Sequence, residues 1–369
     1  MRERPGGAAD GAQEGIGPWI AGPLLDWYRK NARALPWRED TDPYHVWISE
    51  IMLQQTRIET VIPYYLRFIG QLPDIESLAG CDDDRLMKLW QGLGYYSRAR
   101  NLKKSAQILC ETNEGDMYGD YASILSLPGI GQYTAGAVAS ISFGEKVSAV
   151  DGNVLRIGAR LDLDEGNILD SSTSKRIRQK IEAVIPDESP GDFNQALMEL
   201  GELICVPREK ALCGACPLCG QCISHREGRT GSIPVRLAKA QRRKEEKTVF
   251  LITDGERILI RRRPPKGLLA GLYEFPWAEG YKDIGAAADD IAAMGFQVGE
   301  IISLQKVKHV FSHIEWHMIG YLVRTDDAAD AGESGLICVN IEDLEGVYPI
   351  PAAFGKYVQV LHKVMRDGR

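Results

Sequence analysis

Two carboxylates lie in sequence contexts that would give them different protonation states. Glu50 stands inside residues 46–53, which are mostly apolar, and burial there would raise its pKa so that it can act as a general acid near neutral pH. Asp151 precedes a predicted helix, and an N-cap carboxylate stays ionised, as a cation-like reaction centre requires. Both also fit structural roles, because Glu50 could lie on the solvent-exposed edge of an amphipathic helix and Asp151 could be an ordinary N-cap.

A glycine-containing turn is a second candidate site, because its backbone amides could bind a ligand. Gly129 and Gly131 follow Pro128 and precede a predicted helix over residues 133–143, so the backbone can approach a ligand closely and aim a helix N-terminus at it. The flanking segments carry apolar faces, formed by Leu125, Leu127, Ile130, Ala135 and Val138. The pattern predicts a helix-hairpin-helix over residues 126–143, which would hold a nucleic-acid phosphate through backbone amides without a basic surface.

Five of the eight cysteines lie between Cys205 and Cys222, which in a reducing compartment indicates a metal site rather than disulfides. Closely spaced loop thiolates are the usual ligands of iron-sulfur clusters. The candidate ligands of one cluster are Cys205, Cys213, Cys216 and Cys222. Cys219 also allows a zinc site, because the run then contains two Cys-x2-Cys pairs. We favour the cluster.

Composition and charge limit the classes of protein that the chain can belong to. Its 369 residues are expected to form two domains, and 44 % hydrophobic with 26 % charged residues is typical of a soluble globular protein. No apolar run approaches the ~20 residues of a membrane span, and residues 1–19 read as a disordered tail rather than a signal peptide, so we expect a cytoplasmic protein. The net charge of −7 argues against nucleic acid, but basic clusters near residues 98–104, 175–180 and 236–244 weaken that objection unless they are solvated helix faces.

The candidate residues are expected on a helical scaffold followed by a different kind of domain. Residues 20–228 are predicted to be nearly all α, with helices over 24–31, 43–56, 82–91, 99–112, 133–143, 174–185 and 191–204. Residues 229–247 are polar and basic and are predicted to be a linker. Residues 248–369 are predicted to form an α+β domain, with a β-hairpin over 248–261, strands over 301–310, 317–323 and 336–340, and helices over 284–294 and 352–365.

Two polar loops between these helices suit contact with DNA. Gln54, Gln55 and Thr56 end the helix that carries Glu50. A glycine-hinged aromatic loop at residues 92–97 is followed by arginines, and such pairs suit stacking on bases and contact with phosphates. A structural turn whose tyrosines pack inward is an equally good interpretation of that loop on its own.

These segments together resemble one known family. The stretches WISEIMLQQT, GLGYYSRARNL, LPGIGQYTAGAV and VDGNVLRI, followed by the cysteine run, are similar to the MutY-type adenine DNA glycosylases of the helix-hairpin-helix superfamily. The stretches GLLAGLYEFP and HVFSH resemble the MutT-like domain with which that family recognises 8-oxoguanine. The resemblance covers residues 24–363. It implies a multidomain fold: an all-α helix-hairpin-helix glycosylase domain with an iron-sulfur loop at residues 205–222, then an α+β Nudix-like domain.

The resemblance implies removal of adenine mispaired with 8-oxoguanine or guanine in double-stranded DNA, with the adenine flipped out of the duplex. Glu50 would protonate adenine N7 and later activate water, and Asp151 would stabilise the oxocarbenium-like sugar. Tyr133 and Asn153 would position these groups. Related glycosylase/lyases carry a lysine nucleophile where this chain has Tyr133, and a tyrosine cannot form the imine, so we expect a monofunctional enzyme.

Further roles follow from the same resemblance. Residues that would contact DNA are Gln54, Gln55, Thr56, Tyr95, Gly129, Gly131, Phe311, Ser312 and His313, with Gln55 and Tyr95 as wedges and Ser312 on the oxidised guanine. Residues that would line the adenine pocket are Arg38, Leu53, Gln195 and Glu199. The implied cofactor is one structural 4Fe-4S cluster, and the protein is expected to be a monomer.

Two departures from the family pattern bear on these roles. Seven residues separate Cys205 from Cys213 where the family usually has six, which leaves Cys219 as a substitute ligand. Residues 286–295 lack the glutamates of a Nudix helix, so neither bound magnesium nor nucleotide hydrolysis is expected. A pyrimidine or thymine-mismatch glycosylase on the same scaffold and a lesion-binding protein without catalytic activity remain as alternative hypotheses.

Overall fold

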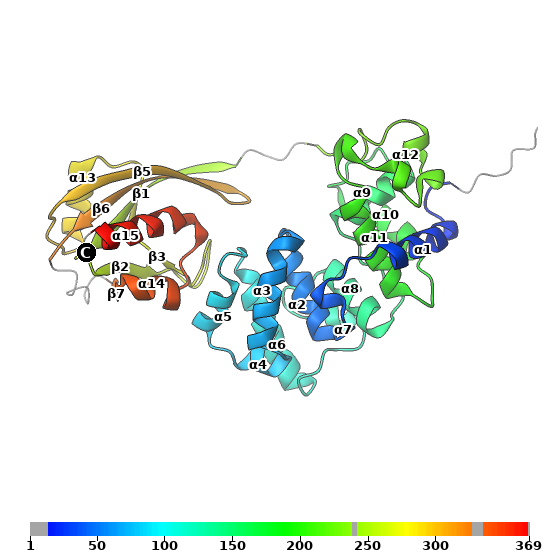
Figure 1. The fold of residues 1–369 in the computed structure, drawn as a ribbon, viewed down its shortest axis with the longest axis horizontal. Coiled ribbons are helices and arrows are strands. Elements are labelled where there is room, and N and C mark those ends of the chain that lie inside the picture. Colours follow the sequence, from blue (N-terminus) through cyan, green and yellow to red (C-terminus); the bar gives the residue numbers. More distant parts are fainter. Residues whose placement is uncertain (1–13, 238–241, 327–334, 368–369) are drawn as a thin grey trace, which may run out of the picture. The chain divides into compact units, whose positions relative to one another are not determined.

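A computed structural model describes residues 14–237, 242–326 and 335–367. The chain divides into two compact units, which we describe separately (Figure 1). The first comprises Met1–Gly80 and Asn101–Ala238, and the second comprises Cys81–Arg100 and Lys239–Arg369. A helical stretch between residues 81 and 100 thus groups with the carboxyl-terminal residues. None of the described helices is long and apolar enough to cross a membrane.

The first unit is helical, as the sequence predicts. Its α-helices are α1 (Ala21–Asn31), α2 (Pro43–Leu53), α3 (Ile58–Gln71), α4 (Ile75–Gly80), α6 (Ser97–Thr112, which begins in the second unit), α7 (Tyr121–Leu125), α8 (Gln132–Phe143), α9 (Gly152–Leu161), α10 (Ser171–Glu182), α11 (Pro190–Leu203) and α12 (Ile223–Arg226). Short 3-10 turns occur at η1 (Pro18–Ile20), η2 (Pro36–Arg38), η3 (Arg208–Lys210), η4 (Cys213–Ala215) and η5 (Cys219–Gln221). Together α7, the glycine turn and α8 form the expected helix-hairpin-helix.

Capping residues place two of the helices that carry the candidate site. Helix α2 starts at Pro43, and the Asp42 carboxylate accepts hydrogen bonds from the amides of Tyr44 (2.8 Å) and His45 (3.4 Å). Helix α9 starts after Asp151, which caps it in the same way. Both helix starts were predicted from the aspartates, because a carboxylate that accepts first-turn amides fixes where the helix begins.

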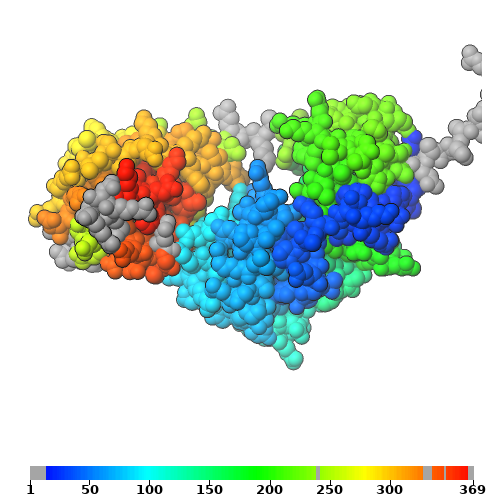
Figure 2. All heavy atoms as spheres, viewed as in Figure 1, coloured from blue at the N-terminus to red at the C-terminus, as the bar shows by residue number. Residues whose placement is uncertain are grey.

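Residues 14–19, which the sequence assigns to a tail, pack onto the rest of the first unit. The Gly15 amide donates to the carbonyl of Gln221 (2.7 Å), and the Ile16 amide donates to Asp162 Oδ1 (2.7 Å). The side chains of Ile16 and Trp19 pack against the core that α1, α9 and α11 share, so apolar burial orders this segment. In the space-filling view the dark blue start of the described chain abuts the green atoms of this region (Figure 2). Residues 1–13 of the predicted tail lie outside the described residues.

Helix α8 packs tightly on the segment that leads to Asp151. A Cβ atom added to Gly136 would lie 2.3 Å from the carbonyl oxygen of Ser148, which is backbone and cannot rotate away. We therefore expect Gly136→Ala to destabilise the fold by about 1–3 kcal/mol despite the better helix propensity of alanine. Gly22→Ala in α1 is the matched control, because its added Cβ meets no atom within 4 Å and should be neutral or stabilising. Thermal unfolding of both variants checks this, and equal melting temperatures would contradict it.

The second unit contains a mixed sheet with strand order β3-β2-β1-β6-β5, in which β4 also pairs with β1 and β7 with β2. The strands are β1 (Arg243–Thr253), β2 (Arg257–Arg262), β3 (Tyr273–Glu274), β4 (Trp277–Glu279), β5 (Ile301–Val310), β6 (Ile314–Arg324) and β7 (Ile337–Asn340). Strands β1 and β6 are parallel, and the other pairs are antiparallel. Strand β1 starts within the predicted linker, at Arg243 rather than Thr248, because β6 continues to pair with it up to Ile314.

Helices cover both faces of this sheet (Figure 1). The helices of the second unit are α5 (Asp83–Trp90), α13 (Ile284–Ala293), α14 (Ile341–Val347) and α15 (Gly355–Asp367), with a 3-10 turn at η7 (Ala352–Phe354). Alternate residues of β1 face opposite ways: Val249 belongs to the core that contains α15, whereas Phe250 belongs to the core that contains α13. The fold class predicted from the sequence, a helical domain followed by an α+β Nudix-like domain, is confirmed.

Candidate active site

A cleft of about 710 Å³ in the first unit brings together most of the candidate residues of the helical domain. Its walls come from α2, α8, α9 and α11 and from the loops before α2 and α3. The predicted residues that line it are Arg38, Glu50, Leu53, Gln54, Gln55, Thr56, Tyr133, Asp151, Asn153, Gln195 and Glu199. Residues from positions 33 to 202 therefore meet at one concave site.

Glu50 is buried on α2 rather than placed on a solvent-exposed edge, with 7 % of its surface exposed. Burial raises its pKa to about 7, the nearby Asp151 carboxylate adds to the rise, and the Tyr133 hydroxyl and Arg38 oppose it. Its Oε2 atom has no hydrogen-bond partner among the described residues. A buried carboxyl with this pKa holds a proton for a substantial part of the time near neutral pH and can donate it.

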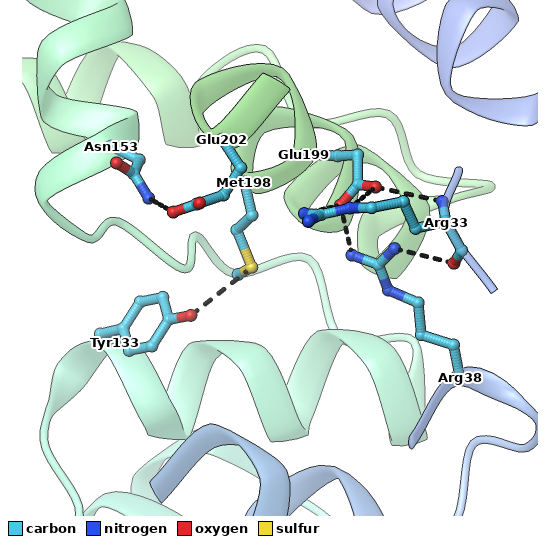
Figure 3. Close-up of polar contacts among 7 residues, drawn as sticks. All are labelled: Arg33, Arg38, Tyr133, Asn153, Met198, Glu199 and Glu202. Atoms are coloured by element: carbon cyan, nitrogen blue, oxygen red, sulfur yellow. Dashed lines mark hydrogen bonds and ion pairs between the residues drawn. The ribbon is translucent and has the colours of Figure 1, made fainter. Parts of the chain in front are cut away.

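Tyr133 stands on α8 beside Glu50. Burial raises its pKa well above 10, and the Glu50 and Asp151 carboxylates add to that effect, so the phenol remains a neutral hydrogen-bond donor. Its hydroxyl also lies 3.5 Å from Sδ of Met198 on α11 (Figure 3). The side chain therefore connects the hairpin helix to both sides of the cleft.

Asp151 caps α9 and also forms part of the cleft wall. Its Oδ1 accepts the amides of Asn153 (2.9 Å) and Val154 (2.8 Å). Burial raises its pKa above the ordinary value, while these two amides and Arg156 act to lower it. The sequence led us to expect a capping carboxylate that stays ionised, whereas desolvation is the larger effect on its pKa and raises it.

A chain of hydrogen bonds runs from Asp151 to the start of the cysteine loop. The Asn153 side chain donates to Glu202 at 2.9 Å (Figure 3). It also accepts from Arg156 Nη2 at 3.0 Å. Arg156 in turn donates to the carbonyls of Gly201 (2.9 Å) and Cys205 (2.7 Å). The orientation of Asn153 therefore depends on the packing of α9 against α11 and the loop that follows it.

Two arginines converge on one buried carboxylate at the opposite side of the cleft (Figure 3). Glu199, with 1 % of its side chain exposed, accepts Arg33 Nε at 2.7 Å and Arg38 Nη2 at 2.9 Å. Burial alone would raise the Glu199 pKa, but these hydrogen bonds lower it overall, so Glu199 is ionised at neutral pH. The Arg33 amide donates to the same carboxylate at 3.1 Å.

The sequence did not single out Arg33, Met198 or Glu202, which also line the cleft. Met198 and Glu202 follow Gln195 on α11 by three and seven positions. They therefore lie on the same helix face as Gln195, and the helical repeat could have predicted them. Arg33 stands in the loop after α1, and its partner is 166 positions away in the sequence. No local pattern indicates such a pair.

The turn after α2 places its polar residues at the edge of the cleft. Gln55 adopts the left-handed conformation with φ of 61°, which costs a non-glycine residue about 1 kcal/mol. The Gln54 amide group donates to Thr134 Oγ1 at 3.4 Å, and the Thr56 amide donates to the Leu53 carbonyl at 3.2 Å. The turn is thus fixed on both sides of the strained residue, which presents an exposed side chain.

The glycine turn before α8 has the geometry that the sequence predicts. Gly129 is left-handed with φ of 78°, and a Cβ there would lie 2.6 Å from the Asn101 side chain. Gly131 is the N-cap of α8 and offers no side chain to the first-turn amides, which need partners from outside the helix. A phosphate oxygen would satisfy them.

The other candidate DNA-contact residues lie in the second unit. Tyr95 is left-handed with φ of 46°, and its hydroxyl lies 2.6 Å from Ser312 Oγ. The Arg98 guanidinium stacks over the rings of Trp90 (5.3 Å) and Tyr95 (5.6 Å) and holds the loop carbonyls of Leu93 and Gly94. Tyr95 is 46 % exposed, so this tyrosine does not pack inward.

Phe311, Ser312 and His313 form the turn between β5 and β6. The Phe311 amide donates to the Ile314 carbonyl at 2.8 Å, which closes the turn. Phe311 is half-buried, whereas Ser312 and His313 are exposed. The turn therefore exposes the Ser312 hydroxyl and the His313 imidazole, and the half-buried Phe311 ring anchors it.

The five clustered cysteines line one small hollow of the first unit, with Arg160, Ile204 and His225 among their neighbours. Arg160 is 1 % exposed and donates to Cys205 Sγ at 3.3 Å, so a buried cation faces the thiols. A polynuclear cluster, which takes its thiolate ligands from separate positions and carries net negative charge, fits this donor set and its buried arginine.

Comparison with known proteins identifies the class to which this fold and site belong. Residues 48–186 match the model of the HhH-GPD superfamily of base excision DNA repair proteins, and residues 248–360 match that of the NUDIX domain. Among solved structures, the chain resembles a thermostable thymine-DNA glycosylase, with a TM-score of 0.51 and 27 % identity over 57 % of this chain and 96 % of that one. The protein is a DNA glycosylase of the helix-hairpin-helix superfamily.

The relatives in sequence narrow the class. The chain is 37 % identical to the adenine DNA glycosylase of Buchnera aphidicola subsp. Baizongia pistaciae over 79 % of this chain and 82 % of that protein. It is 39 % identical to the adenine DNA glycosylase of Arabidopsis thaliana over 69 % of this chain, which spans 46 % of the length of that relative. The chain belongs to the adenine DNA glycosylase family.

Proposed function

We propose that this protein removes adenine from mispairs with 8-oxoguanine or guanine in double-stranded DNA, by hydrolysis of the N-glycosidic bond. Two carboxyl groups with different environments lie in one cleft, and they support this reaction. Glu50 has a pKa of about 7 because it is buried, and Asp151 is held by two amides at a helix N-terminus. Glycosidic cleavage needs one group that can donate a proton and one that can face positive charge on the sugar.

The proposed reaction assigns one task to each group. A flipped adenine enters the cleft, and Glu50 gives its proton to N7 as the bond from C1′ to N9 breaks and its electron pair goes to the base. Asp151 Oδ1 is engaged by amides, which leaves Oδ2 to face the oxocarbenium-like sugar. Water then adds to C1′ and returns a proton to Glu50. Tyr133 and Asn153 hold the two carboxyl groups in place.

The ion-paired side of the cleft suits the base rather than the sugar. Arg33 and Arg38 fix Glu199, and all three line the cleft together with Leu53 and Gln195. Donors and a carboxylate held in fixed positions can bond to the edge of a purine, and burial strengthens such bonds. These residues form the proposed adenine pocket.

We further propose that the enzyme is monofunctional. The position that would carry a Schiff-base lysine holds Tyr133, whose raised pKa keeps the phenol neutral. The exposed side chains of Gln55 and Tyr95 would wedge into the duplex, the amides around Gly129 and Gly131 would hold a phosphate, and Gln54 and Thr56 would border the DNA. Ser312, supported by Phe311 and His313, would bond to the oxidised guanine. We expect a cytoplasmic monomer.

The proposed cofactor is one 4Fe-4S cluster held by Cys205, Cys213, Cys216 and Cys222, which would fix the loop structurally. We expect Cys213→Ser to lose the cluster and Cys219→Ser to keep it, because the first replaces a ligand and the second does not. Iron and sulfide content per protein, with the visible absorbance of the cluster, checks both variants. The reverse result would assign the ligand to Cys219, and retention of zinc without sulfide in the wild type would contradict the cluster.

The raised pKa of Glu50 predicts the dependence of the reaction on pH. Glu50 must be protonated to act as an acid, and its protonated fraction falls about tenfold per pH unit above its pKa of about 7. Single-turnover adenine release should therefore decline with that slope at alkaline pH. At acidic pH the rate should fall again once Asp151 is protonated, since its charge is then lost. A rate that stays constant well above pH 7 would contradict the role of Glu50.

A panel of duplexes that differ in one base pair tests the proposed substrate. We expect base release under single turnover from adenine opposite 8-oxoguanine and, more slowly, from adenine opposite guanine. No release is expected from thymine opposite guanine, although the structural likeness to a thymine-DNA glycosylase makes this the necessary comparison. Release of thymine alone would favour a thymine-mismatch glycosylase, and tight binding without any release would favour a lesion-binding protein.

A further inference from the structure

A lysine is buried between two tryptophans in the second unit. One of these tryptophans contacts the turn that carries Phe311, Ser312 and His313. Lys247 on β1 is 5 % exposed, and its Nζ lies 3.5 Å from the ring centre of Trp277 and 4.9 Å from that of Trp316. Its ion-pair partner is Glu245 at 3.5 Å. Burial of a lysine costs desolvation and side-chain entropy, and an apolar residue of similar length would fill the space at lower cost.

The two tryptophans are fixed by carboxylates as well as by the lysine. The Trp316 indole donates to Glu245 at 2.9 Å, and the Trp277 indole donates to Glu274 at 2.9 Å. Glu274 is 2 % exposed and also pairs with Arg261 (2.9 Å) and Arg263. The guanidinium of Arg263 lies 5.6 Å from the Trp316 ring. The contacts therefore form a closed ring of residues, which we call the circuit: Lys247, Trp277, Glu274, Arg263 and Trp316.

The circuit reaches the β5–β6 turn through one aromatic contact. The Phe311 ring meets Trp316 edge-on, with centroids 4.9 Å apart and planes at 72°. The His309 ring also meets Phe311 edge-on, with centroids 4.6 Å apart and planes at 62°. The exposed Ser312 and His313 follow directly, so the Trp316 ring supports the aromatic residue that anchors the turn with the Ser312 hydroxyl.

We propose that Lys247 is a positioning residue for recognition of 8-oxoguanine, acting through Trp316 and Phe311 on the turn that carries Ser312. This inference rests on the proposed function of that turn. The ammonium group attracts both indole faces and holds Trp316 in one orientation, which a neutral side chain cannot do. Its effect falls on selection between 8-oxoguanine and guanine, because no group of the circuit lies in the cleft that contains Glu50 and Asp151.

The test compares Lys247→Met with Lys282→Met in the full-length protein. Lys282 lies in the same unit, is partly exposed and pairs with Asp290 at 3.5 Å, so its loss removes a charge outside the circuit. The readout is the ratio of single-turnover rates for adenine opposite 8-oxoguanine and opposite guanine. We expect Lys247→Met to lower the ratio about tenfold and leave the rate on adenine opposite guanine unchanged, while Lys282→Met keeps the wild-type ratio.

A double-mutant cycle with Ser312→Ala separates positioning from a general loss of stability. If Lys247 acts through the turn, Lys247→Met should add little to the loss of preference that Ser312→Ala causes alone. Lys247→Arg, which keeps the charge over the rings, should restore most of the preference. Independent, additive losses or an unchanged ratio in Lys247→Met would overturn the inference. A wild type without any preference for 8-oxoguanine would instead reject the proposed function of the turn, and this inference with it.

If Lys247→Met does not fold, Trp316→Phe offers the same test, since it keeps an aromatic ring against Phe311 but removes the indole that Lys247 and Glu245 hold. The expected result is again a lower ratio with unchanged excision opposite guanine. Equal ratios for Trp316→Phe and the wild type would count against the circuit.

Discussion

Glu50→Gln is expected to slow adenine release strongly while leaving DNA binding intact. The amide has the same shape but no proton to give, and loss of a general acid costs about 10²–10⁴-fold in rate. Single-turnover excision and binding titrations on the same duplex measure the two effects separately. Glu111→Gln, an exposed carboxylate on α6, is the matched control and should retain full activity. Turnover of Glu50→Gln at the wild-type rate would exclude Glu50 as the acid.

The same variant should be more stable than the wild type at alkaline pH. The pKa of Glu50 is raised in the folded state, from 4.5 to about 7, so its contribution to stability is present below pH 4.5 and is lost as the pH rises through 7. At pH 8 the ionised, buried carboxylate then costs roughly 3 kcal/mol, which glutamine avoids. A rise in melting temperature at pH 8 that vanishes near pH 5 would show that the inactive variant is folded and that the group is desolvated. Equal shifts at both pH values would contradict the raised pKa.

Asp151→Asn is expected to lower adenine release by about 10²–10³-fold without unfolding the protein. Asparagine caps helices as well as aspartate does, so the amides of Asn153 and Val154 keep an acceptor and α9 keeps its start. What disappears is the negative charge that faces the sugar. Single-turnover kinetics and thermal unfolding of the same sample separate loss of charge from loss of structure.

Asp42→Asn is the control for this prediction. Asp42 caps α2 through the same kind of contact with two amides, yet it does not line the cleft. We expect it to keep wild-type activity and stability. A similar loss of activity in both variants would mean that capping, rather than the charge of Asp151, is what the reaction needs.

The local features of the fold were predictable because they depend on neighbours in the sequence. Asp42 and Asp151 mark helix starts by their own side chains, and the alternation along β1 follows from the two-residue repeat of a strand. Only the family resemblance predicted that Glu50, Tyr133 and Asp151 would lie in one cleft. Spacing alone could not bring α2, α8 and α9 together.

The features that escaped prediction depend on distant partners. Arg33 gains its role only when α11 places Glu199 against it, and Lys247 is buried because β4 and β6 bring Trp277 and Trp316 to its two sides. Asp151 is a cap, as expected, but its raised pKa comes from burial by the whole first unit. Desolvation is a property of the assembled fold, so a sequence can suggest it only through local hydrophobicity.

A single-turnover assay on a duplex with adenine opposite 8-oxoguanine, read with and without alkali, shows whether Glu50 and Asp151 act as a hydrolytic pair. We expect free adenine in both samples and strand cleavage only after alkali, because Glu50 and Asp151 hydrolyse the glycosidic bond and Tyr133 cannot form an imine. Strand cleavage without alkali would mean that a lyase nucleophile acts in this cleft. Intact adenine in both samples would contradict the account of Glu50 and Asp151 as a catalytic pair.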